Sequence, residues 1–370
     1  MENRTIESFP PGEYIKDELE ARGWTQGDLA RIMGRQDSVV SAIINGKRSV
    51  SSEIASELAS AFGTSAEVWL NLQTSYDLAS KPKIVEEVSR RAKLFAVAPV
   101  KDMIRRGWIR GTDDLGALER QVVEFLNEPI AAVSFHKPKP NADITPTQRA
   151  WLCRARRLAR GLQAEKFSQA IFARALNTLK KLMANPEDTK HVARVLAEAG
   201  VRFLIVEALP QTSIDGACFW LDESSPVIAL TMRYDRIDNF WYILGHECGH
   251  VENEDGIDGD ILDLNLVGDE RIPFEAKSEK EKRADRFAEE LLVHQLDLQD
   301  FIDRKAPAFS KQLIRGFAMR MKVHPGIVLG QLQYRGEVGY FHSREMLVKV
   351  RDIVTQTALT DGFGHIISLN

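Results

Sequence analysis

FWYILGHECGH, residues 240–250, carries an H-E-x-x-H pentapeptide directly after an apolar run. Two histidines four residues apart lie on the same side of a helix, close enough to bind one metal ion. Glu247 follows the first histidine and is placed to take a proton from an attacking water molecule. The pattern therefore predicts a helix in which His246 and His250 are metal ligands and Glu247 is the catalytic base, an arrangement typical of zinc peptidases.

The residues around this motif favour a metal site over two structural histidines that match the pattern by chance. Asp238 is expected to cap the helix N-terminus, and Phe240, Ile243 and Leu244 form an apolar face that should be buried. Burial suits a metal helix because a dry site strengthens the electrostatic interactions of the ion. Cys248 points away from the ligand face and is expected in the core.

The third metal ligand is expected from a second helix, which starts near Ser278. A catalytic zinc site usually has three protein ligands and leaves the fourth position open. On this helix Glu281 and Asp285 share a face with apolar residues. We predict that Glu281 is the third ligand and that Asp285 holds the far nitrogen of a ligand histidine. Zinc is the expected ion, with manganese as an alternative.

A capping box is the alternative interpretation of this helix start, because Glu281 stands three residues after Ser278. A carboxylate that caps the helix cannot easily bind a metal as well. Other carboxylates that could then serve as the third ligand are Glu279, Glu252 and Glu254.

The composition is that of an ordinary globular protein. Its 370 residues argue for two or three domains, and a net charge of -4 gives no global basic field. The three cysteines are scattered and odd in number, which predicts no disulfide framework and fits a reducing cytoplasm. The first residues lead to no apolar signal segment, and no apolar run is long enough to cross a membrane. We therefore expect a cytoplasmic protein without membrane contact.

The first part of the chain has the pattern of a small helical bundle. Helices are expected over 12–22, 26–33, 37–45, 52–62 and 65–72. Thr25 is the expected cap of the second helix, with Asp28 at the capping-box position, and Gly34 makes the following turn. A helix, a tight turn with glycine and another helix are the layout of a helix-turn-helix unit.

The remaining chain is expected to be α+β and mostly helical. Strands are predicted over 201–208, 217–221 and 227–231, giving a small sheet beside the H-E-x-x-H helix. The segment 136–143 is rich in proline and polar residues and is the best candidate for a linker. The predicted domains are 1–80, a helical bridging region with the linker over 81–144, a zincin-like domain over 145–340, and a tail over 341–370.

The N-terminal part resembles the XRE-type DNA-binding domain of HigA-like antitoxins. The motifs that carry the resemblance are Gly23-Trp24-Thr25-Gln26, Ile43-Ile44-Asn45-Gly46-Lys47-Arg48 and Phe62-Gly63-Thr64-Ser65, and it covers about the first eighty residues. It implies operator DNA as a partner, a homodimer, and a recognition helix from Gln36 to Ser41.

The implied DNA-contacting residues fall into two groups. Gln36, Ser38 and Ser41 would face bases, whereas Asn45, Lys47 and Arg48 would touch phosphates. Asp37 departs from the basic or neutral residue of many relatives, because an acid can accept from cytosine but repels phosphates. The alternative is an exposed helix face that binds protein. The full set is Gln26, Gln36, Asp37, Ser38, Ser41, Asn45, Lys47 and Arg48.

The second part resembles the ImmA/IrrE family of zinc metallopeptidases over roughly residues 150–335. The motifs are Ile214-Asp215-Gly216-Ala217, His246-Glu247-Cys248-Gly249-His250 and Ala284-Asp285-Arg286-Phe287-Ala288. The resemblance implies a small α+β fold, a gluzincin-like zinc site, and cleavage of repressor-type regulators that carry a helix-turn-helix domain. Arg283 departs from the acidic residue often seen just before the Ala-Asp pair, which leaves Glu281 as the best ligand candidate.

Two functional hypotheses follow. The first is a DNA-binding transcriptional regulator with a zinc-dependent endopeptidase domain, which cleaves a repressor-type regulator or itself. The second is a repressor, or an antitoxin that neutralises a toxin partner, whose metal domain senses or scaffolds without proteolysis. Candidates for a group that assists at the substrate carbonyl are Tyr234, His324 and His342.

Overall fold

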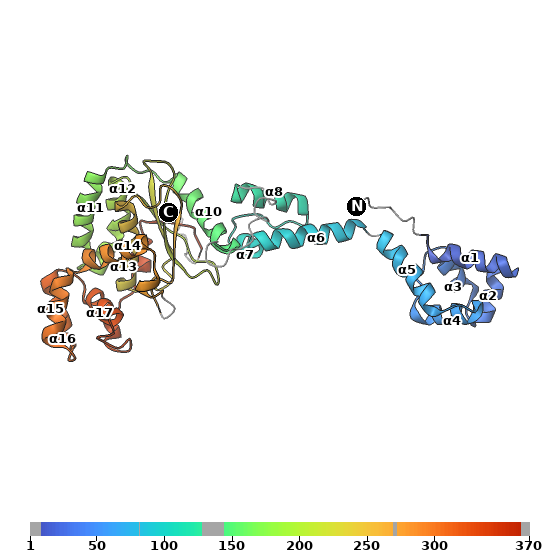
Figure 1. Cartoon of the computed structure of the whole chain (residues 1–370). Coiled ribbons are helices and arrows are strands. Elements are labelled where there is room, and N and C mark those ends of the chain that lie inside the picture. The colour runs from blue at the N-terminus through green and yellow to red at the C-terminus, as the bar shows by residue number, and fades with distance from the viewer. Residues whose placement is uncertain (1–8, 81, 128–143, 269–271, 364–370) are drawn as a thin grey trace. The chain divides into compact units, whose positions relative to one another are not determined.

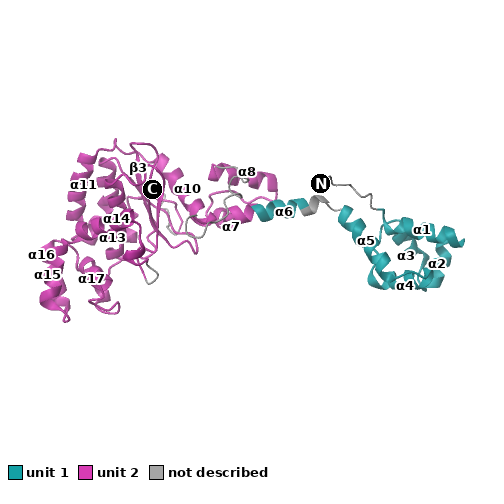
Figure 2. Cartoon of the chain, in the orientation of Figure 1, with its two compact units in different colours: residues 1–93 teal, residues 94–370 magenta. Residues whose placement is uncertain are grey.

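The computed structural model describes residues 9–80, 82–127, 144–268 and 272–363. The chain forms two compact units, residues 1–93 and residues 94–370 (Figure 2). Each unit has its own hydrophobic core. The predicted linker over 136–143 lies outside the described residues.

Unit 1 is a bundle of helices, as the pattern predicts (Figure 1). Thr25 and Asp28 form the expected capping box at the start of the second helix. Large apolar side chains fill the core, among them Leu29, Ile54 and Trp69, each at most 2% exposed. The helices are α1 Pro11–Arg22, α2 Gln26–Met33, α3 Asp37–Ile44, α4 Ser52–Phe62 and α5 Ala66–Ser80, followed by α6 Pro82–Val97, which continues into unit 2.

Unit 2 is mostly helical around one mixed sheet. Its helices are α7 Val100–Arg105, α8 Leu115–Leu126, α10 Pro146–Gly161, α11 Gln169–Leu182, α12 Val192–Glu198, α13 Ile237–Glu252, α14 Glu279–Leu292, α15 Gln295–Lys305, α16 Lys311–Met321, α17 Pro325–Tyr334 and α18 Arg351–Val354. Short 3-10 turns are η1 Pro186–His191, η2 Phe274–Ala276 and η3 Arg344–Met346. The strands are β1 Arg202–Ile205, β2 Ile214–Trp220, β3 Pro226–Leu230, β4 Ile261–Leu264 and β5 Leu359–Thr360.

The sheet has the strand order β4-β2-β3-β1-β5. β1 pairs in parallel with β3 and β5, whereas β2 pairs antiparallel with β3 and β4. The three predicted strand regions are present, but the prediction missed β4 and β5, because each is short and takes its place through long-range pairing.

Both faces of the sheet are covered, so successive residues of a strand enter different cores. Ile228 and Leu230 of β3 belong to the core on the α13 side, whereas Val227 and Ala229 belong to the core on the α8 and α10 side. β3 is therefore apolar along its whole length, as strands buried on both faces are.

The boundary expected near residue 145 is wrong, because the helices before it cover one face of the sheet. Val122 and Phe125 of α8 share a core with Trp151 of α10 and with alternate strand residues. Trp151 Nε1 also donates to the Val206 carbonyl at 3.0 Å. Residues 341–363 of the segment expected to be a tail likewise pack within unit 2, since they supply β5 and the buried Val354.

Within the described residues, no helix combines the length and the apolar character that crossing a membrane requires.

This packing predicts how fragments of the chain behave. A fragment of residues 82–370 should fold, whereas one of residues 145–370 should expose the sheet face that α8 covers. We expect the shorter fragment to bind a hydrophobic dye and to lose its cooperative thermal transition. Equal melting temperatures for the two fragments, measured by circular dichroism with dye fluorescence, would contradict the boundary at residue 93.

Candidate metal centre and nucleic-acid interface

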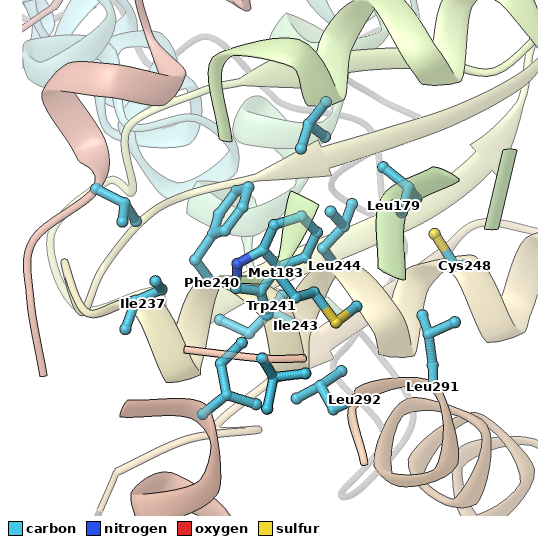
Figure 3. Packing of buried hydrophobic residues seen from close by; sticks show 14 of the residues in the cluster. Leu179, Met183, Ile237, Phe240, Trp241, Ile243, Leu244, Cys248, Leu291 and Leu292 are labelled. Atoms are coloured by element: carbon cyan, nitrogen blue, oxygen red, sulfur yellow. The ribbon is translucent and has the colours of Figure 1, made fainter. Parts of the chain in front are cut away.

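Helix α13 carries the H-E-x-x-H motif in the centre of unit 2. Its apolar residues Phe240, Trp241, Ile243 and Leu244 lie beside Leu291 and Leu292 of α14, as Figure 3 shows. The helix begins at Ile237, so the prediction that Asp238 caps it is wrong. Asp238 lies in the first turn instead, where its carboxylate pairs with Arg236 at 2.6 Å. Cys248 is fully buried in the core, as predicted.

Helices α13 and α14 approach each other closely through small residues. A Cβ atom added at Gly249 would lie 3.0 Å from the Ala284 Cα atom, and one at Gly245 would lie 3.2 Å from Ala288 Cα. Larger residues at these positions would separate the two backbones. The close approach brings the first turn of α14 beside the two histidines of α13.

Four side chains converge at this point, namely His246, His250, Asp263 and Glu281. Their candidate ligand atoms all lie within 4.8 Å of one another. The two Nε2 atoms are 3.1 Å apart, and Glu281 lies 3.2 Å from His246 Nε2 and 3.6 Å from His250 Nε2. The predicted ligands His246, His250 and Glu281 are therefore brought together, and Asp263 of β4 joins them.

Each histidine is held from behind by an aspartate. Asp285 Oδ1 lies 3.0 Å from His246 Nδ1, which is the role predicted for Asp285. Asp255 Oδ2 lies 3.1 Å from His250 Nδ1. Because both Nδ1 atoms face carboxylates, both Nε2 atoms are turned to the centre and are free to bind a metal.

These two outer aspartates have cationic partners of their own. Lys277 contacts Asp285 at 2.7 Å, and Arg283 contacts Asp255 at 2.9 Å. Arg283 is the residue that departs from the ImmA/IrrE pattern, and its guanidinium here fixes the aspartate behind His250. Tyr242 donates a further bond to Asp285 at 2.9 Å.

At the start of α14, Glu281 does not complete a capping box. Ser278 Oγ accepts from the Glu281 backbone N–H at 3.3 Å, so the serine caps the helix. The Glu281 carboxylate faces the histidines instead of completing a capping box. Glu279 is paired with Lys282 at 3.0 Å, and neither Glu252 nor Glu254 belongs to the cluster.

Glu247 is fully buried beside the four-residue cluster. Neither carboxylate oxygen has a hydrogen-bond partner among the described residues. The space for this side chain comes from Gly216 of β2, where an added Cβ atom would lie 2.9 Å from Glu247 Cδ and closer still to Oε1. Glycine at this position therefore lets a carboxylate stand against the sheet, next to the histidines.

The buried charges alter several pKa values. Burial, followed by the nearby Asp263 carboxylate, raises the pKa of Glu247 well above its usual range. Burial alone would raise the pKa of Glu281, but the contacts with His246 and His250 lower it. Burial would lower the pKa of His246, but Asp263, Asp285 and Glu281 together raise it.

The sequence prediction did not include Asp263 or Asp255. Asp263 lies on a short strand whose pairing could not be read from local periodicity. Asp255 follows α13 in an acidic segment, and its spacing from His250 is the only feature of the sequence that indicates a role beside this histidine.

The residues predicted to assist at the substrate carbonyl do not belong to the cluster. His324 caps α17, where its Nδ1 atom accepts from the Gly326 N–H at 3.1 Å. Tyr234 lines a separate cavity of about 410 Å³, and His342 follows α17.

The predicted DNA-contacting residues lie on and around α3 in unit 1. Gln26, Gln36, Asp37, Ser38, Asn45, Lys47 and Arg48 are exposed, whereas Ser41 is half-buried. The Asn45 side chain donates to the Ser41 carbonyl at 2.8 Å, so Asn45 caps the C-terminus of α3. Within the described part of the chain, Lys47 and Arg48 have no ion-pair partner. Both cations are therefore available to phosphate.

Similarity to known proteins identifies the family to which unit 1 belongs. A helix-turn-helix family model matches residues 15–69. The chain is 34% identical over 84 residues to the uncharacterized HTH-type transcriptional regulator YddM of Escherichia coli, covering 23% of this chain and 88% of that protein. The chain belongs to the HTH-type transcriptional regulators. Unit 1 is thus the DNA-binding part of this regulator.

Antitoxin proteins are also similar to the regulator. Antitoxin HigA-1 of Vibrio cholerae is 43% identical over 68 residues, which cover 18% of this chain and 64% of the antitoxin. The structure of an addiction module antidote protein of a HigA family from Coxiella burnetii is 36% identical, covers 22% of this chain and 94% of its own, and has a TM-score of 0.21. These matches cover the helix-turn-helix region of the chain.

The role of Gly216 is open to a direct test. In Gly216→Ala the new methyl group would meet the Glu247 carboxylate, which cannot move away without disturbing the core. We expect a loss of about 1–3 kcal/mol in the free energy of unfolding, the usual cost of overpacking. Gly259→Ala is the control, because a Cβ atom there meets nothing within 4 Å. Urea unfolding curves that coincide for the two variants would disprove the close approach.

Proposed function

We propose that this regulator combines operator binding by unit 1 with a zinc-dependent endopeptidase in unit 2. The substrate class is a repressor-type helix-turn-helix regulator, or the chain itself. The single observation that carries the proposal is the buried, unpaired carboxylate of Glu247 beside the cluster of His246, His250 and Glu281. A carboxylate without a partner costs free energy of folding, and a catalytic base is a reason to keep it.

The donor set fits zinc, with manganese as an alternative. Two imidazole Nε2 atoms and a carboxylate are the ligands of many catalytic zinc sites. An aspartate oxygen lies beside each Nδ1 atom, at 3.0 Å from His246 and 3.1 Å from His250, the position from which carboxylates support metal-bound histidines. Zinc at this place would polarise the scissile carbonyl and lower the pKa of an attacking water molecule.

The side chains of unit 2 have distinct roles in this proposal. Glu247 accepts the proton of the attacking water and can pass it to the leaving amine. Burial raises the pKa of this carboxyl, which makes the carboxylate a stronger base. Asp285 and Asp255 keep the two imidazoles in position, and Lys277 and Arg283 form ion pairs with those aspartates.

A second candidate function is a repressor or antitoxin whose metal centre acts without proteolysis. The observation that favours it is the burial of the site, because His246, Glu247 and His250 are each 0% exposed. A polypeptide substrate needs access that these residues do not offer in this conformation. In this alternative, metal binding would change the stability of unit 2 and thereby regulate the protein.

The partners follow from unit 1 and its relatives. Operator DNA, in the form of a pseudo-palindrome bound by a homodimer, suits a helix-turn-helix regulator. The similarity to antitoxin HigA-1 makes a toxin a second protein partner within the proposal.

The peptidase hypothesis predicts a separation between metal binding and catalysis. Glu247→Gln should keep about one zinc ion per chain, because the imidazoles and Glu281 are unchanged. Its cleavage rate should fall by about a hundredfold or more, because an amide cannot accept the proton. The measurement is mass spectrometry of the zinc-loaded protein incubated alone and with helix-turn-helix regulators from the same cells.

Glu254→Gln is the matched control for this experiment, because Glu254 is an exposed acid beyond the end of α13. It should change neither zinc content nor cleavage. If the Glu247→Gln variant cuts as fast as wild type, Glu247 is not the base; if wild type cuts nothing while zinc removal changes DNA affinity, the second candidate function replaces the first.

The DNA interface predicts two different kinds of variant. Lys47→Ala with Arg48→Ala should weaken binding to all sequences and reduce the slope of log affinity against log salt by about two. Gln36→Ala should instead change the preferred sequence, since its exposed side chain stands at the N-terminus of α3. The measurement is selection from a random DNA pool followed by titration at several salt concentrations.

Lys16→Ala is the control, because Lys16 is paired with Glu13 on α1 at 2.7 Å. Its salt dependence should equal that of wild type. Equal losses of affinity for selected and random DNA in Gln36→Ala would exclude a base contact by this residue.

A further inference from the structure

We infer that Asp263 of β4 is a fourth protein donor of the metal centre, so that the site is closed by protein in this conformation. The inference rests on the metal centre of the proposed function, but not on its peptidase activity. It adds a ligand that neither the H-E-x-x-H motif nor the family resemblance indicates.

The geometry places Asp263 at the same two nitrogen atoms as Glu281. Asp263 Oδ1 lies 3.6 Å from His246 Nε2, and Oδ2 lies 3.7 Å from His250 Nε2. Glu281 spans the same two nitrogen atoms at 3.2 and 3.6 Å. Each carboxylate therefore faces both imidazoles, as two donors around one shared ion would.

The sheet directs Asp263 toward the histidines. Leu262 and Leu264 of β4 pack into the core on the α10 side, whereas Ile261 packs on the α13 side. By strand alternation Asp263 shares the α13 side. Its register partner on β2 is Gly216, which has no side chain to stand between the carboxylate and α13.

The charges of the centre give an independent argument for a cation. Asp263 is 3% exposed, and its Oδ2 atom is buried without a hydrogen-bond partner. Among the described residues, Asp263, Glu281 and Glu247 have no Lys or Arg ion pair, whereas the outer Asp255 and Asp285 do. Converging buried carboxylates repel one another strongly. A divalent ion between them would compensate this charge, and the unpaired Asp263 oxygen points to it.

A fourth protein donor changes what the centre can do. Sites closed by four protein ligands are typical of structural zinc, whereas catalytic sites keep one position open. With Asp263 bound, hydrolysis would require this carboxylate to leave the centre first. β4 is an edge strand that pairs with β2 alone, so its withdrawal would break only one strand pairing.

The test compares Asp263→Ala and Asp263→Asn with Asp260→Asn in the full chain. Asp260 lies three residues earlier, pairs with Arg156 and is outside the cluster, so the control removes the same charge from the same segment. Zinc affinity is measured by competition with a chromophoric chelator. The absorption spectrum of the cobalt(II)-loaded protein reports the donor set directly.

We expect both Asp263 variants to lose zinc affinity by about tenfold or more and to shift the cobalt spectrum, with Asp260→Asn like wild type. The shape-conserving Asp263→Asn decides the question if the alanine variant does not fold. Unchanged affinity and spectrum in Asp263→Asn would overturn the inference while leaving the metal centre intact. If wild type binds zinc no better than His246→Ala, the metal centre of the proposed function fails, and the fourth donor fails with it.

Discussion

The close approach of α13 and α14 is the constraint on which the candidate site depends. It exists because Gly245 and Gly249 face Ala284 and Ala288, so the two backbones meet with almost no side chain between them. A wider spacing would still allow a packed core, but it would carry Glu281 away from the two imidazoles. The pairing of small residues therefore converts an ordinary helix contact into a cluster of metal-binding groups. The same approach places Asp285 behind His246, so one interface supplies both a donor and its support.

The ionic groups of the centre are arranged in two layers. In the outer layer, aspartates support the imidazoles and are themselves neutralised by Lys277 and Arg283. In the inner layer, Asp263, Glu281 and Glu247 have only the imidazoles nearby within the described structure. The difference is physically informative, because a folded chain pairs its buried charges unless something else compensates them. The outer aspartates thus have cationic partners within the protein, whereas a cation is the partner that we propose for the inner carboxylates.

Local periodicity was enough to predict much of this arrangement. The helix faces of α13 and α14 can be read from the sequence, so His246, His250 and Glu281 could be predicted as metal ligands and Asp285 as the support of a histidine. Asp263 could not be, because its place depends on the pairing of β4 with β2, and no local pattern encodes that register. The boundary near residue 145 failed for a related reason. The helices before it look independent along the chain, but their apolar faces cover a sheet that is formed much later in the sequence.

Relatives identify unit 1 as a helix-turn-helix of transcriptional regulators, and the cluster of histidines and carboxylates lies in unit 2. The candidate metal centre draws its groups from α13, α14 and the edge strand β4, which are far apart in the chain. An ion held there would join these elements, and its binding free energy would become part of the stability of unit 2. Metal occupancy would then influence the protein whether or not Glu247 ever receives a proton. Proteolysis would be a further step, available only when the centre has an open position for water.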